Sequence, residues 1–421
     1  MASLLQEMVA DPKKNNVFRM SAGIPISYPL PTFPVLNQQL GGVYKYTIPD
    51  GTVCTYRRTG FTAGQFVLVT GESNCGKTTA CQQMAWDIVD PFGADAMMIM
   101  FDGERSSDWL RVQIITGAST ERLNESFSLN QEIVTWDGVL EALKDIGLKK
   151  EADRKRYTYD TGVVDIFGNP IIMFKPTCVV VDSLKKFVSE AEFKTVESGD
   201  LSDLFAGGRE AIFRGKFYRN ALEFLYRYNI MVFVIHHLND DIQGASSPFA
   251  KKPKALTFMP NGKVLTGGET MKFFTSTMIH VTPDNAVKEQ WTVAENGYKA
   301  IQTKFLIYKS RGGDAIGKTS THVLVPAAGY KPELTLMQYA WDNGLVTGTG
   351  KHCRFTDDGI RFDRNRLMEE FENKPELFRE LITAVKPKLD TELELFDTTG
   401  GKFELEKTRS NKNLMKELGI V

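Results

Sequence analysis

The sequence predicts an α/β protein with a mostly parallel central sheet, on the strength of three observations. Apolar runs alternate with segments of helical periodicity along residues 41–330. One of these runs, residues 66–70, leads through a glycine-rich turn into a helical stretch at 79–89 that contains neither Gly nor Pro. Apolar residues make up 42% of the chain and charged residues 24%, which is ordinary for a soluble globular protein. Strands that alternate with helices favour a parallel sheet covered on both faces.

The pattern assigns the elements of this core in chain order. The predicted strands are residues 66–70, 96–101, 178–181, 230–235 and 305–308. The predicted helices between them are residues 79–89, 108–116, 136–146 and 210–228. Each strand is a short apolar run bounded by polar residues, as expected for strands that are buried on both faces.

We expect four regions along the chain. Residues 1–40 hold a short apolar helix candidate and then a Pro-rich extended stretch, which together indicate an N-terminal arm. Residues 41–330 form the core, with a basic, turn-rich insert at 149–176 that contains a hairpin signal at 167–170. Helical patterns at 334–343 and 364–385 predict a small C-terminal α/β lobe at 331–395, and residues 396–421 form a tail.

A phosphate-binding loop is predicted between the strand at 66–70 and the helix that follows it. It reads G-x-x-x-x-G-K-T: Gly71, Glu72, Ser73, Asn74, Cys75, Gly76, Lys77 and Thr78, with Thr79 next in the chain. The glycines let backbone N–H groups approach phosphates, and the helix N-terminus adds partial positive charge. Lys77 is expected to reach the β- and γ-phosphates of a nucleotide, and Thr78 to offer its hydroxyl to Mg²⁺.

The same motif occurs a second time, at residues 312–319, in a different context. There Lys318 and Thr319 lead into a β-branched stretch that continues through residue 325. A strand, a glycine turn and a second strand predict a hairpin, which offers no helix N-terminus to a phosphate. We therefore expect one nucleotide site, at the first motif.

Two of the predicted strands end in carboxylates that suit nucleotide hydrolysis. Asp182 follows the strand at 178–181, which is the form of a Walker B element whose acid helps to hold Mg²⁺. Glu104 follows the strand at 96–101 and is a candidate general base for the attacking water. Each acid alone is also compatible with an ordinary solvated strand end, and the nearby phosphate loop favours the catalytic interpretation.

A long cationic segment lies downstream of the strand at 230–235. Residues 242–268 contain no Asp or Glu, but they contain Lys251, Lys252, Lys254 and Lys263 together with Phe249 and Phe258. Lysines suit phosphates and isolated rings can insert between bases, so this composition favours single-stranded nucleic acid. The net charge of −1 gives no global attraction, so such binding must depend on a local segment. The alternative is an ordinary solvated surface loop.

Several classes of protein are disfavoured by composition. The five cysteines have no C-x-x-C spacing, which argues against zinc and a disulfide framework and fits a reducing cytoplasm. No apolar run approaches the ~20 residues that a bilayer crossing needs, and no signal-peptide pattern is present. We therefore expect a cytoplasmic protein with no membrane partner.

Taken in order, these motifs resemble the RecA family of recombinases, and most closely its phage branch, typified by UvsX. The likeness runs from about residue 40 to 388 and includes the segments 60–64, 71–78, 101–104, 178–183, 232–237, 267–274, 286–289, 309–311 and 334–346. The resemblance implies a RecA-like P-loop ATPase core that uses ATP and Mg²⁺. It also implies a DNA strand-exchange recombinase that forms filaments on single-stranded DNA, in homologous recombination, repair and recombination-dependent replication.

The resemblance further implies roles for individual residues. Glu104 takes the position of the general base, and Asp108 the position that contacts adenine. His237 takes the position of the γ-phosphate sensor, although a hydrogen-bonded imidazole at a strand end is the alternative. Lys309 and Arg311 match a cation pair that reaches into a neighbouring subunit's nucleotide site. Residues 242–268 match the second DNA-binding loop. The first, near 195–208, is acidic here, so its basic contribution is left to Arg209, Arg214, Lys216 and Arg219.

The implied partners are single-stranded and double-stranded DNA, further copies of the chain, and loader and single-strand-binding proteins, in the cytoplasm of a bacterial host cell. The arm at 1–40 is expected to dock on a neighbouring protomer. The insert, the length of the 242–268 loop and a tail that is not acidic depart from the family pattern. Two alternatives remain open: a hexameric helicase or motor of the same fold, and a non-catalytic ATP-binding paralogue.

Overall fold

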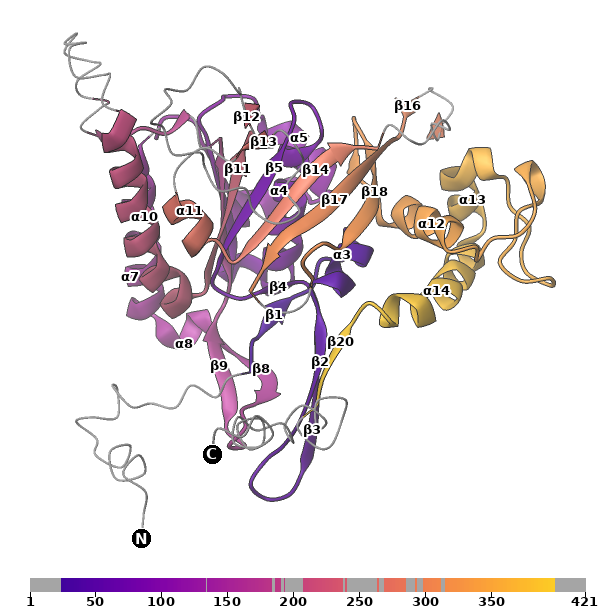
Figure 1. Cartoon of the computed structure of the whole chain (residues 1–421), viewed down its shortest axis with the longest axis horizontal. Helices are drawn as coiled ribbons and strands as arrows, with labels where there is room; N and C mark the ends of the chain where they lie inside the picture. The colour runs from indigo at the N-terminus through magenta and orange to yellow at the C-terminus, as the bar shows by residue number, and fades with distance from the viewer. Residues whose placement is uncertain are drawn as a thin grey trace, which may run out of the picture.

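A computed structural model describes residues 24–133, 135–183, 186–190, 193, 207–237, 239–240, 263–264, 269–284, 292–293, 298–311 and 315–397. Its centre is a nine-stranded sheet flanked by helices, with a smaller helical lobe beside it (Figure 1). The strand order across this sheet is β19-β18-β17-β14-β5-β11-β10-β6-β7. The predicted α/β architecture is therefore confirmed.

The sheet is parallel over most of its width. The parallel strands are β5 (Phe66–Gly71), β6 (Met97–Asp102), β7 (Phe127–Asn130), β10 (Thr177–Asp182), β11 (Ile230–His236) and β14 (Thr277–Pro283). The antiparallel strands are β17 (Ile301–Ser310), β18 (Thr319–Val325) and β19 (Gly329–Tyr330). The parallel register brings the ends of β5, β6, β10 and β11 to one edge of the sheet, the usual ligand-binding edge of such folds.

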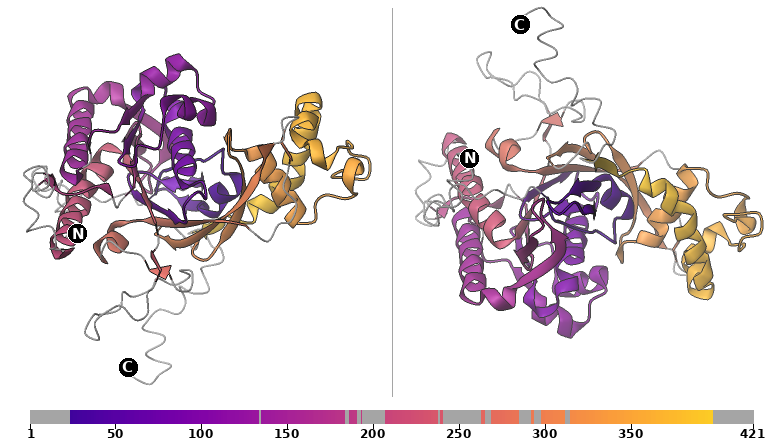
Figure 2. Two further views of the ribbon diagram at one scale, coloured as in Figure 1. Left: turned by 90° about the horizontal axis from the view of Figure 1, so that it is seen from above. Right: turned by 90° about the horizontal axis from the view of Figure 1, so that it is seen from below.

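Helices cover both faces of the sheet (Figure 2). One face carries α4 (Lys77–Val89), α5 (Trp109–Thr116) and α6 (Thr120–Ser126), and its apolar cluster includes Val67, Val180 and Phe233. The other carries α7 (Trp136–Ala152), α10 (Gly207–Tyr228) and α11 (Glu269–Phe274), and its cluster includes Phe66, Val179 and Val232. Every residue of β5, β10 and β11 is buried, which explains their unbroken apolar sequences.

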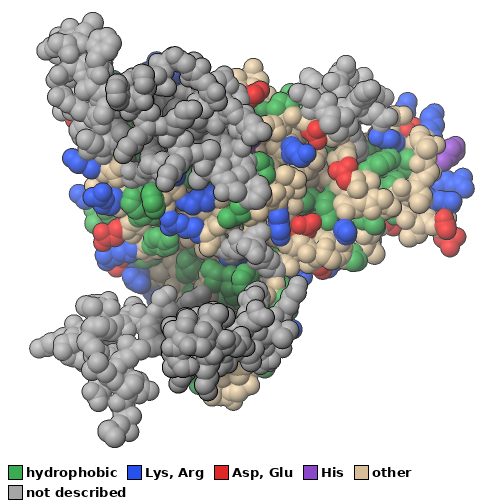
Figure 3. All heavy atoms as spheres, in the orientation of Figure 1, with side chains coloured by type: hydrophobic (Ala, Val, Ile, Leu, Met, Phe, Trp, Pro, Cys, Tyr) green, Lys and Arg blue, Asp and Glu red, His purple; other side chains and the backbone are tan. Residues whose placement is uncertain are grey.

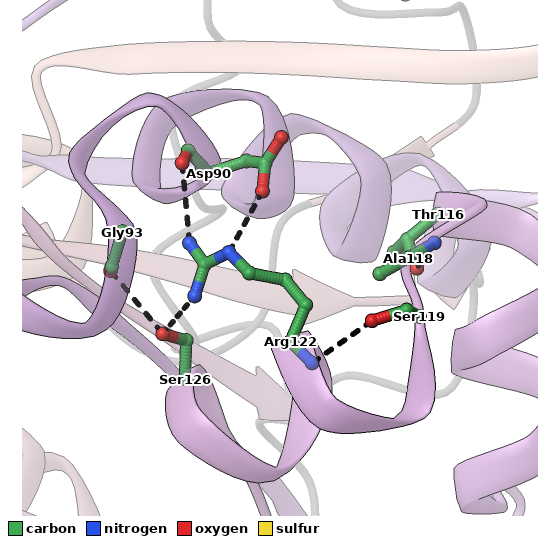
Figure 4. A network of polar contacts seen from close by, with 7 residues as sticks. All are labelled: Asp90, Gly93, Thr116, Ala118, Ser119, Arg122 and Ser126. Carbon is green, nitrogen blue, oxygen red and sulfur yellow. Dashed lines mark hydrogen bonds and ion pairs between the residues drawn. The ribbon is translucent and has the colours of Figure 1, made fainter.

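Arg122 fixes α6 to the turn that follows the P-loop helix. Its guanidinium donates to the Asp90 carboxylate and carbonyl, each at 3.1 Å, and to the Ser126 hydroxyl (Figure 4). Asp90 begins a 3-10 helix, η1 (Asp90–Asp95), and Ser126 donates to the Gly93 carbonyl at 3.3 Å. The same guanidinium lies 5.2 Å from the centre of the Trp86 ring on α4. This network holds together the end of the helix whose beginning is the phosphate loop.

The described part of the N-terminal region, residues 24–40, packs on the core. It contains β1 (Ser27–Tyr28), paired with β4 (Phe61–Thr62), and α3 (Pro34–Gln39). Leu30, Phe33 and Leu36 are fully buried in the same apolar cluster as α4. The backbone N–H and hydroxyl of Thr32 both donate to the Asp87 carboxylate of α4, at 3.0 and 2.8 Å.

Two hairpins extend below the sheet in Figure 1. The first is β2 (Gly42–Thr47) and β3 (Val53–Arg58), and the second is β8 (Thr158–Val164) and β9 (Pro170–Phe174), with α8 (Arg154–Tyr157) before it. The Tyr46 hydroxyl donates to the Val164 carbonyl at 2.6 Å and so joins them. The hairpin predicted at 167–170 is confirmed. α7 continues through the predicted start of the insert at residue 149 and ends at Ala152.

The C-terminal lobe contains α12 (Pro332–Asp342), α13 (Leu367–Asn373) and α14 (Pro375–Asp390), with short 3-10 turns η4 (Gly350–His352) and η5 (Arg364–Arg366). The helical stretch predicted at 364–385 is helical but divided, since α13 ends at Asn373 and Pro375 begins a new helix. The last strand, β20 (Glu394–Asp397), leaves the lobe and pairs with β2.

Four very short strands complete the description. They are β12 (Asn239–Asp240) with β13 (Lys263–Val264), and β15 (Thr292–Val293) with β16 (Tyr298–Lys299). Within the described ranges, no helix combines the length and the apolar character that a bilayer crossing requires.

Candidate nucleotide-binding site

A cavity of about 640 Å³ opens at the carboxyl edge of the parallel strands. It is lined by Ser73, Asn74, Gly76, Lys77, Thr78, Thr79, Glu104, Ser106, Ser107, Arg111, Asp182, Lys186, Ile235, His237, Ile301, Leu324 and Pro326. The fold thus brings together residues of the predicted ATPase motifs that are up to about 160 positions apart along the sequence, from Ser73 to His237. Its volume is in the range of small-molecule sites.

The first G-x-x-x-x-G-K-T segment has the local geometry of a phosphate loop. Gly76 has φ of 86° and caps the N-terminus of α4, and Asn74 also has a positive φ, of 61°. A Cβ on Gly76 would lie 2.6 Å from the Tyr330 hydroxyl, so glycine is required for backbone and for packing reasons. The Lys77 side chain is 5% exposed, and its ammonium donates to the Glu72 carbonyl inside the loop.

Thr78 and Asp182 meet directly. The Thr78 hydroxyl donates to Asp182 Oδ2 at 2.7 Å, which links the start of α4 to the end of β10. The pKa of Asp182 is raised to about 6, mainly by burial and in part by the charges of Glu104 and Asp102, while the hydrogen bond from Thr78 acts to lower it. A hydroxyl and a carboxylate at the phosphate loop are hard oxygen ligands of the kind that Mg²⁺ prefers, so these residues fit a nucleotide-bound magnesium ion.

Glu104 is held at the same edge by a neighbour from the next strand. The Ser183 hydroxyl donates to Glu104 Oε1 at 2.6 Å, and His237 Nε2 lies 3.9 Å from that oxygen. The Gly103 N–H donates to the Asp182 carbonyl at 2.6 Å, which fastens the end of β6 to the end of β10. The predicted base, the predicted sensor and the predicted magnesium ligand are therefore adjacent.

Asp102 supports this edge from below, a role that the sequence analysis did not assign. It is fully buried, and its Oδ2 accepts hydrogen bonds from the Ser107 N–H at 2.8 Å and from Gln131 Nε2 at 3.1 Å. Gln82 of α4 donates to the Ser107 hydroxyl at 3.2 Å. Ser106 and Ser107 line the cavity, so Asp102 shapes its wall through the backbone after Glu104.

Arg111 is one of the lining residues that the sequence did not predict. Its guanidinium donates to Thr79 Oγ1 at 3.2 Å and to the Pro326 carbonyl at 3.3 Å, and so bridges α4 and the turn after β18. Asp108, the expected adenine contact, is exposed and caps α5 by accepting the Arg111 N–H at 2.7 Å. Asp108 does not line the cavity, whereas Arg111 presents a planar cation to it.

Lys309 and Arg311 lie away from the phosphate loop, toward the end of the sheet at which β5 begins. Lys309 is level with Met278 of β14 and Leu68 of β5, and the Arg311 N–H donates to the Ser276 carbonyl at 3.0 Å. Both side chains donate to carbonyls at the end of α11, Lys309 to Lys272 and Arg311 to Phe273. Burial, and then the charge of Arg311, lower the pKa of Lys309 to about 8.

The second G-x-x-x-x-G-K-T segment joins β17 to β18, as predicted. The two strands pair antiparallel, from Ile301 with Leu324 to Leu306 with Thr319. Lys318 points to the C-terminal lobe, where its ammonium donates to the Glu392 carbonyl at 3.0 Å. No helix follows the turn, so this segment lacks the phosphate-binding geometry of the first.

The predicted DNA-binding residues fall largely outside the described part of the chain. Lys251, Lys252, Lys254, Phe249 and Phe258 lie outside it altogether. Lys263 lies in β13 and Arg209 and Arg214 lie in α10, but only their backbone is described. The exposed cations of α10 whose side chains are described include Lys216, Arg219 and Arg227.

Comparison with known proteins supports the nucleotide site. Residues 52–206 match the family model described as ATPase: KaiC. No curated protein was found to be similar to the chain. The matched range contains the phosphate loop, Glu104 and Asp182, and it ends before His237, Lys309 and Arg311. Residues 52–206 are therefore similar to a KaiC-like ATPase domain of the RecA-fold P-loop type, and that family uses nucleotide and Mg²⁺ in general.

Proposed function

We propose that this protein is an ATP-dependent DNA strand-exchange recombinase of the phage UvsX type, which assembles as a helical filament on single-stranded DNA. The proposal extends the ATPase assignment in two directions, toward assembly and toward DNA. Homologous recombination, repair and recombination-dependent replication are the processes that such an activity serves.

The observation that carries the proposal is the separation of Lys309 and Arg311 from the phosphate loop of their own protomer. Arg311 bonds Ser276, and the Ser276 N–H bonds the Phe66 carbonyl at the first residue of β5. Gly71 is the last residue of β5, so at about 3.3 Å per residue Arg311 lies roughly 17 Å along the strand from the phosphate loop, and Lys309, level with Leu68, lies roughly 10 Å from it. Head-to-tail stacking of protomers would bring this end of the sheet in one copy to the nucleotide edge of the next.

Hydrolysis in this arrangement uses the residues that line the cavity. Lys77 and the backbone N–H groups of the loop bind the phosphates. Thr78 and Asp182 would hold Mg²⁺, which would supply positive charge against the developing charge of the phosphates. Glu104, oriented by Ser183, accepts the proton of the attacking water. His237 lies beside Glu104 at the end of β11, immediately before the chain leads toward the cationic loop at 242–268. Arg111 offers its guanidinium plane to the base.

DNA binding is assigned to the cationic loop and to the flank of α10. The loop residues are Lys251, Lys252, Lys254 and Lys263 with Phe249 and Phe258, and Arg209 and Arg214 begin α10. Figure 3 shows Lys and Arg side chains gathered over the flank formed by α10 and the helices beside it. A net charge of −1 means that this local patch, rather than the overall charge, would attract the phosphates.

A hexameric helicase or motor is the main alternative, since a closed ring would also place one protomer's cations at its neighbour's nucleotide. The KaiC-like match is compatible with both assemblies, because it covers only the shared ATPase domain. A non-catalytic paralogue is the second alternative, and the presence of Lys77, Thr78, Glu104 and Asp182 in one cavity argues against it.

Negative-stain microscopy with single-stranded DNA and a non-hydrolysable ATP analogue separates these functions. A recombinase gives helical filaments whose length follows the DNA, and it pairs a homologous duplex in a strand-exchange assay. Closed rings with no strand exchange would favour a hexameric helicase or motor over a recombinase. Absence of ordered assembly together with absence of ATP turnover would favour the non-catalytic paralogue.

A mixing experiment tests the shared site separately. Lys77→Ala protein has a defective phosphate loop and intact cations, and the double variant Lys309→Ala with Arg311→Ala has the reverse. If the cations act in trans, the mixture contains complete interfaces and regains part of the DNA-stimulated turnover. No rescue at any ratio, in mixtures shown to co-assemble, would mean that the cations do not act across an interface.

A further inference from the structure

The strand that carries Lys309, β17, contains a β-bulge near its end, and Arg311 follows that end. β14 and β17 pair Met278 with Lys309 and Ile279 with Ile307, so Tyr308 has no partner on β14. An extra residue of this kind changes which way the following side chains point. Because side chains alternate across a strand, a one-residue shift moves all later residues to the other face.

The bulge decides the face on which the two cations lie. Phe305 and Ile307 belong to the apolar cluster beneath α4, whereas Tyr308 belongs to the cluster beneath α10 and α11. Strict alternation would return Lys309 and Arg311 to the α4 face. Both instead donate to the end of α11, which lies on the same face as Tyr308. Two successive residues, Tyr308 and Lys309, therefore face the same helix layer.

Tyr308 is in turn anchored to the strand that leads into the phosphate loop. Its hydroxyl and Thr70 Oγ1 share a hydrogen bond of 3.2 Å, and Thr70 Oγ1 lies 3.0 Å from His280 Nδ1 of β14. Both Thr70 and Tyr308 are buried, and burial raises the pKa of Tyr308, so its hydroxyl keeps its proton. Thr70 immediately precedes Gly71, the first residue of the phosphate loop.

We propose that Tyr308 is a positioning residue: its bulge and its hydrogen bond to Thr70 aim Lys309 and Arg311 at the neighbouring protomer's nucleotide. This inference depends on the proposed action of the cations in trans. It adds a physical link between the phosphate-loop strand of a protomer and the cations that the same protomer presents to its neighbour.

The test mixes Tyr308→Phe protein separately with each of the two variants of the mixing experiment, Lys77→Ala and the double variant Lys309→Ala with Arg311→Ala. Tyr308→Phe keeps the ring and its packing but loses the hydroxyl, so its own phosphate loop stays competent. We expect its DNA-stimulated turnover to fall about three- to tenfold, the range that corresponds to the removal of one hydrogen bond. Its affinity for a fluorescent ATP analogue should stay within about twofold of the parent, because the cations of the free protomer do not touch its own nucleotide.

Recovery of DNA-stimulated turnover should then depend on which of the two variants is mixed with Tyr308→Phe. Lys77→Ala protein supplies well-placed cations to the Tyr308→Phe phosphate loop, so this mixture should gain activity. The double variant Lys309→Ala with Arg311→Ala needs cations from Tyr308→Phe, so that mixture should gain little. A general loss of stability would lower both mixtures equally, and equal rescue in both would overturn the assignment. Tyr28→Phe, which removes another buried hydroxyl bonded to Tyr159 at 3.0 Å, is the matched control and should behave like the parent.

Two further variants keep the test independent of Tyr308→Phe. Thr70→Val removes the other hydroxyl of the pair. If the hydrogen bond is the cause, DNA-stimulated turnover of the combined variant Thr70→Val with Tyr308→Phe should be no lower than that of the more affected single variant. Additive losses would show that the hydrogen bond is not the link. Deletion of Tyr308 removes the bulge and, where circular dichroism shows native folding, should match the double cation variant in both mixtures.

If the mixture of Lys77→Ala with the double variant Lys309→Ala and Arg311→Ala regains no turnover, the proposed action in trans is refuted, and this inference is refuted with it. If that mixture regains turnover and Tyr308→Phe donates its cations normally, only the role of Tyr308 is refuted. The two failures are therefore distinguishable within one set of measurements.

Discussion

The Thr78 hydroxyl donates a 2.7 Å hydrogen bond to Asp182 Oδ2, across the gap between the P-loop helix and the end of β10. These two residues are far apart in the sequence and come from motifs that were identified separately. Their contact shows that the phosphate loop and the Walker B strand form one site. Glu104 and His237 complete it, because both lie within the same cavity.

Glu104 and Lys77 should affect hydrolysis in different ways. Glu104→Gln should bind ATP normally but turn it over on the order of 10²–10⁴-fold more slowly, since the water loses its base. Lys77→Ala should weaken binding as well, because the cation that contacts the phosphates is removed. Equilibrium binding of a fluorescent ATP analogue and steady-state phosphate release measure the two effects. Turnover by Glu104→Gln within a few-fold of the parent would remove Glu104 from the mechanism.

Arg111 should contribute to binding of the base and not of the phosphates. Arg111→Ala should weaken ATP binding by about tenfold, the upper part of the range for stacking on a cation, and leave inorganic tripolyphosphate affinity unchanged. Arg111→Lys keeps the charge but loses the plane, so it should resemble Arg111→Ala. Competition binding with both ligands provides the measurement. Equal losses for ATP and tripolyphosphate would place Arg111 at the phosphates.

Lys318 should be dispensable for nucleotide binding. Lys318→Ala removes the hydrogen bond to the Glu392 carbonyl and should lower stability slightly, by about 1 kcal/mol or less. ATP affinity and turnover should stay within about twofold of the parent, because the segment is a hairpin without a helix N-terminus. Chemical denaturation and ATP binding on the same samples test both statements. A loss of ATP affinity comparable to that of Lys77→Ala would contradict the choice of site.

DNA affinity should be electrostatic and should depend on the loop at 242–268. Neutralising Lys251, Lys252 and Lys254 together should weaken single-strand binding and reduce the salt slope by roughly 0.7 for each phosphate that the loop no longer neutralises. Fluorescence anisotropy with labelled oligonucleotides across a salt series measures that slope. Lys149→Ala, in the last turns of α7, is a control for the loss of one lysine elsewhere on the surface. A slope that does not change would show that the loop lysines do not bind phosphate.

Turnover should decline at alkaline pH as Lys309 loses its charge. The pKa of Lys309 is lowered to about 8, first by burial and then by Arg311, so the ammonium is present below that pH and is lost as the pH rises through it. DNA-stimulated turnover should therefore fall between about pH 7.5 and 9. Lys309→Arg remains charged over this range and should abolish the decline. A pH profile in Lys309→Arg with the same alkaline limb would assign the ionisation to another group.

The strands and the phosphate loop could be predicted because their signals are local. Residues 66–78 contain an apolar run, a glycine turn and the start of a helix in immediate succession, and β5 and α4 follow that pattern closely. The hairpin at the second motif could also be predicted, since β-branched residues follow Lys318. The helix boundary at Lys374 was missed because the apolar period continues across it, although Pro375 marks the break.

The sequence by itself determined the fold class, the phosphate loop and the acids at the strand ends, because these depend on the order of neighbouring residues and on strand periodicity. Only the tertiary structure placed Ser183 on Glu104, Arg111 between Thr79 and Pro326, and Asp102 beneath Ser107. It also decided, through a one-residue bulge, the face on which Lys309 and Arg311 lie. Such contacts depend on sheet order and register, which residues distant in the chain determine jointly and no local pattern encodes.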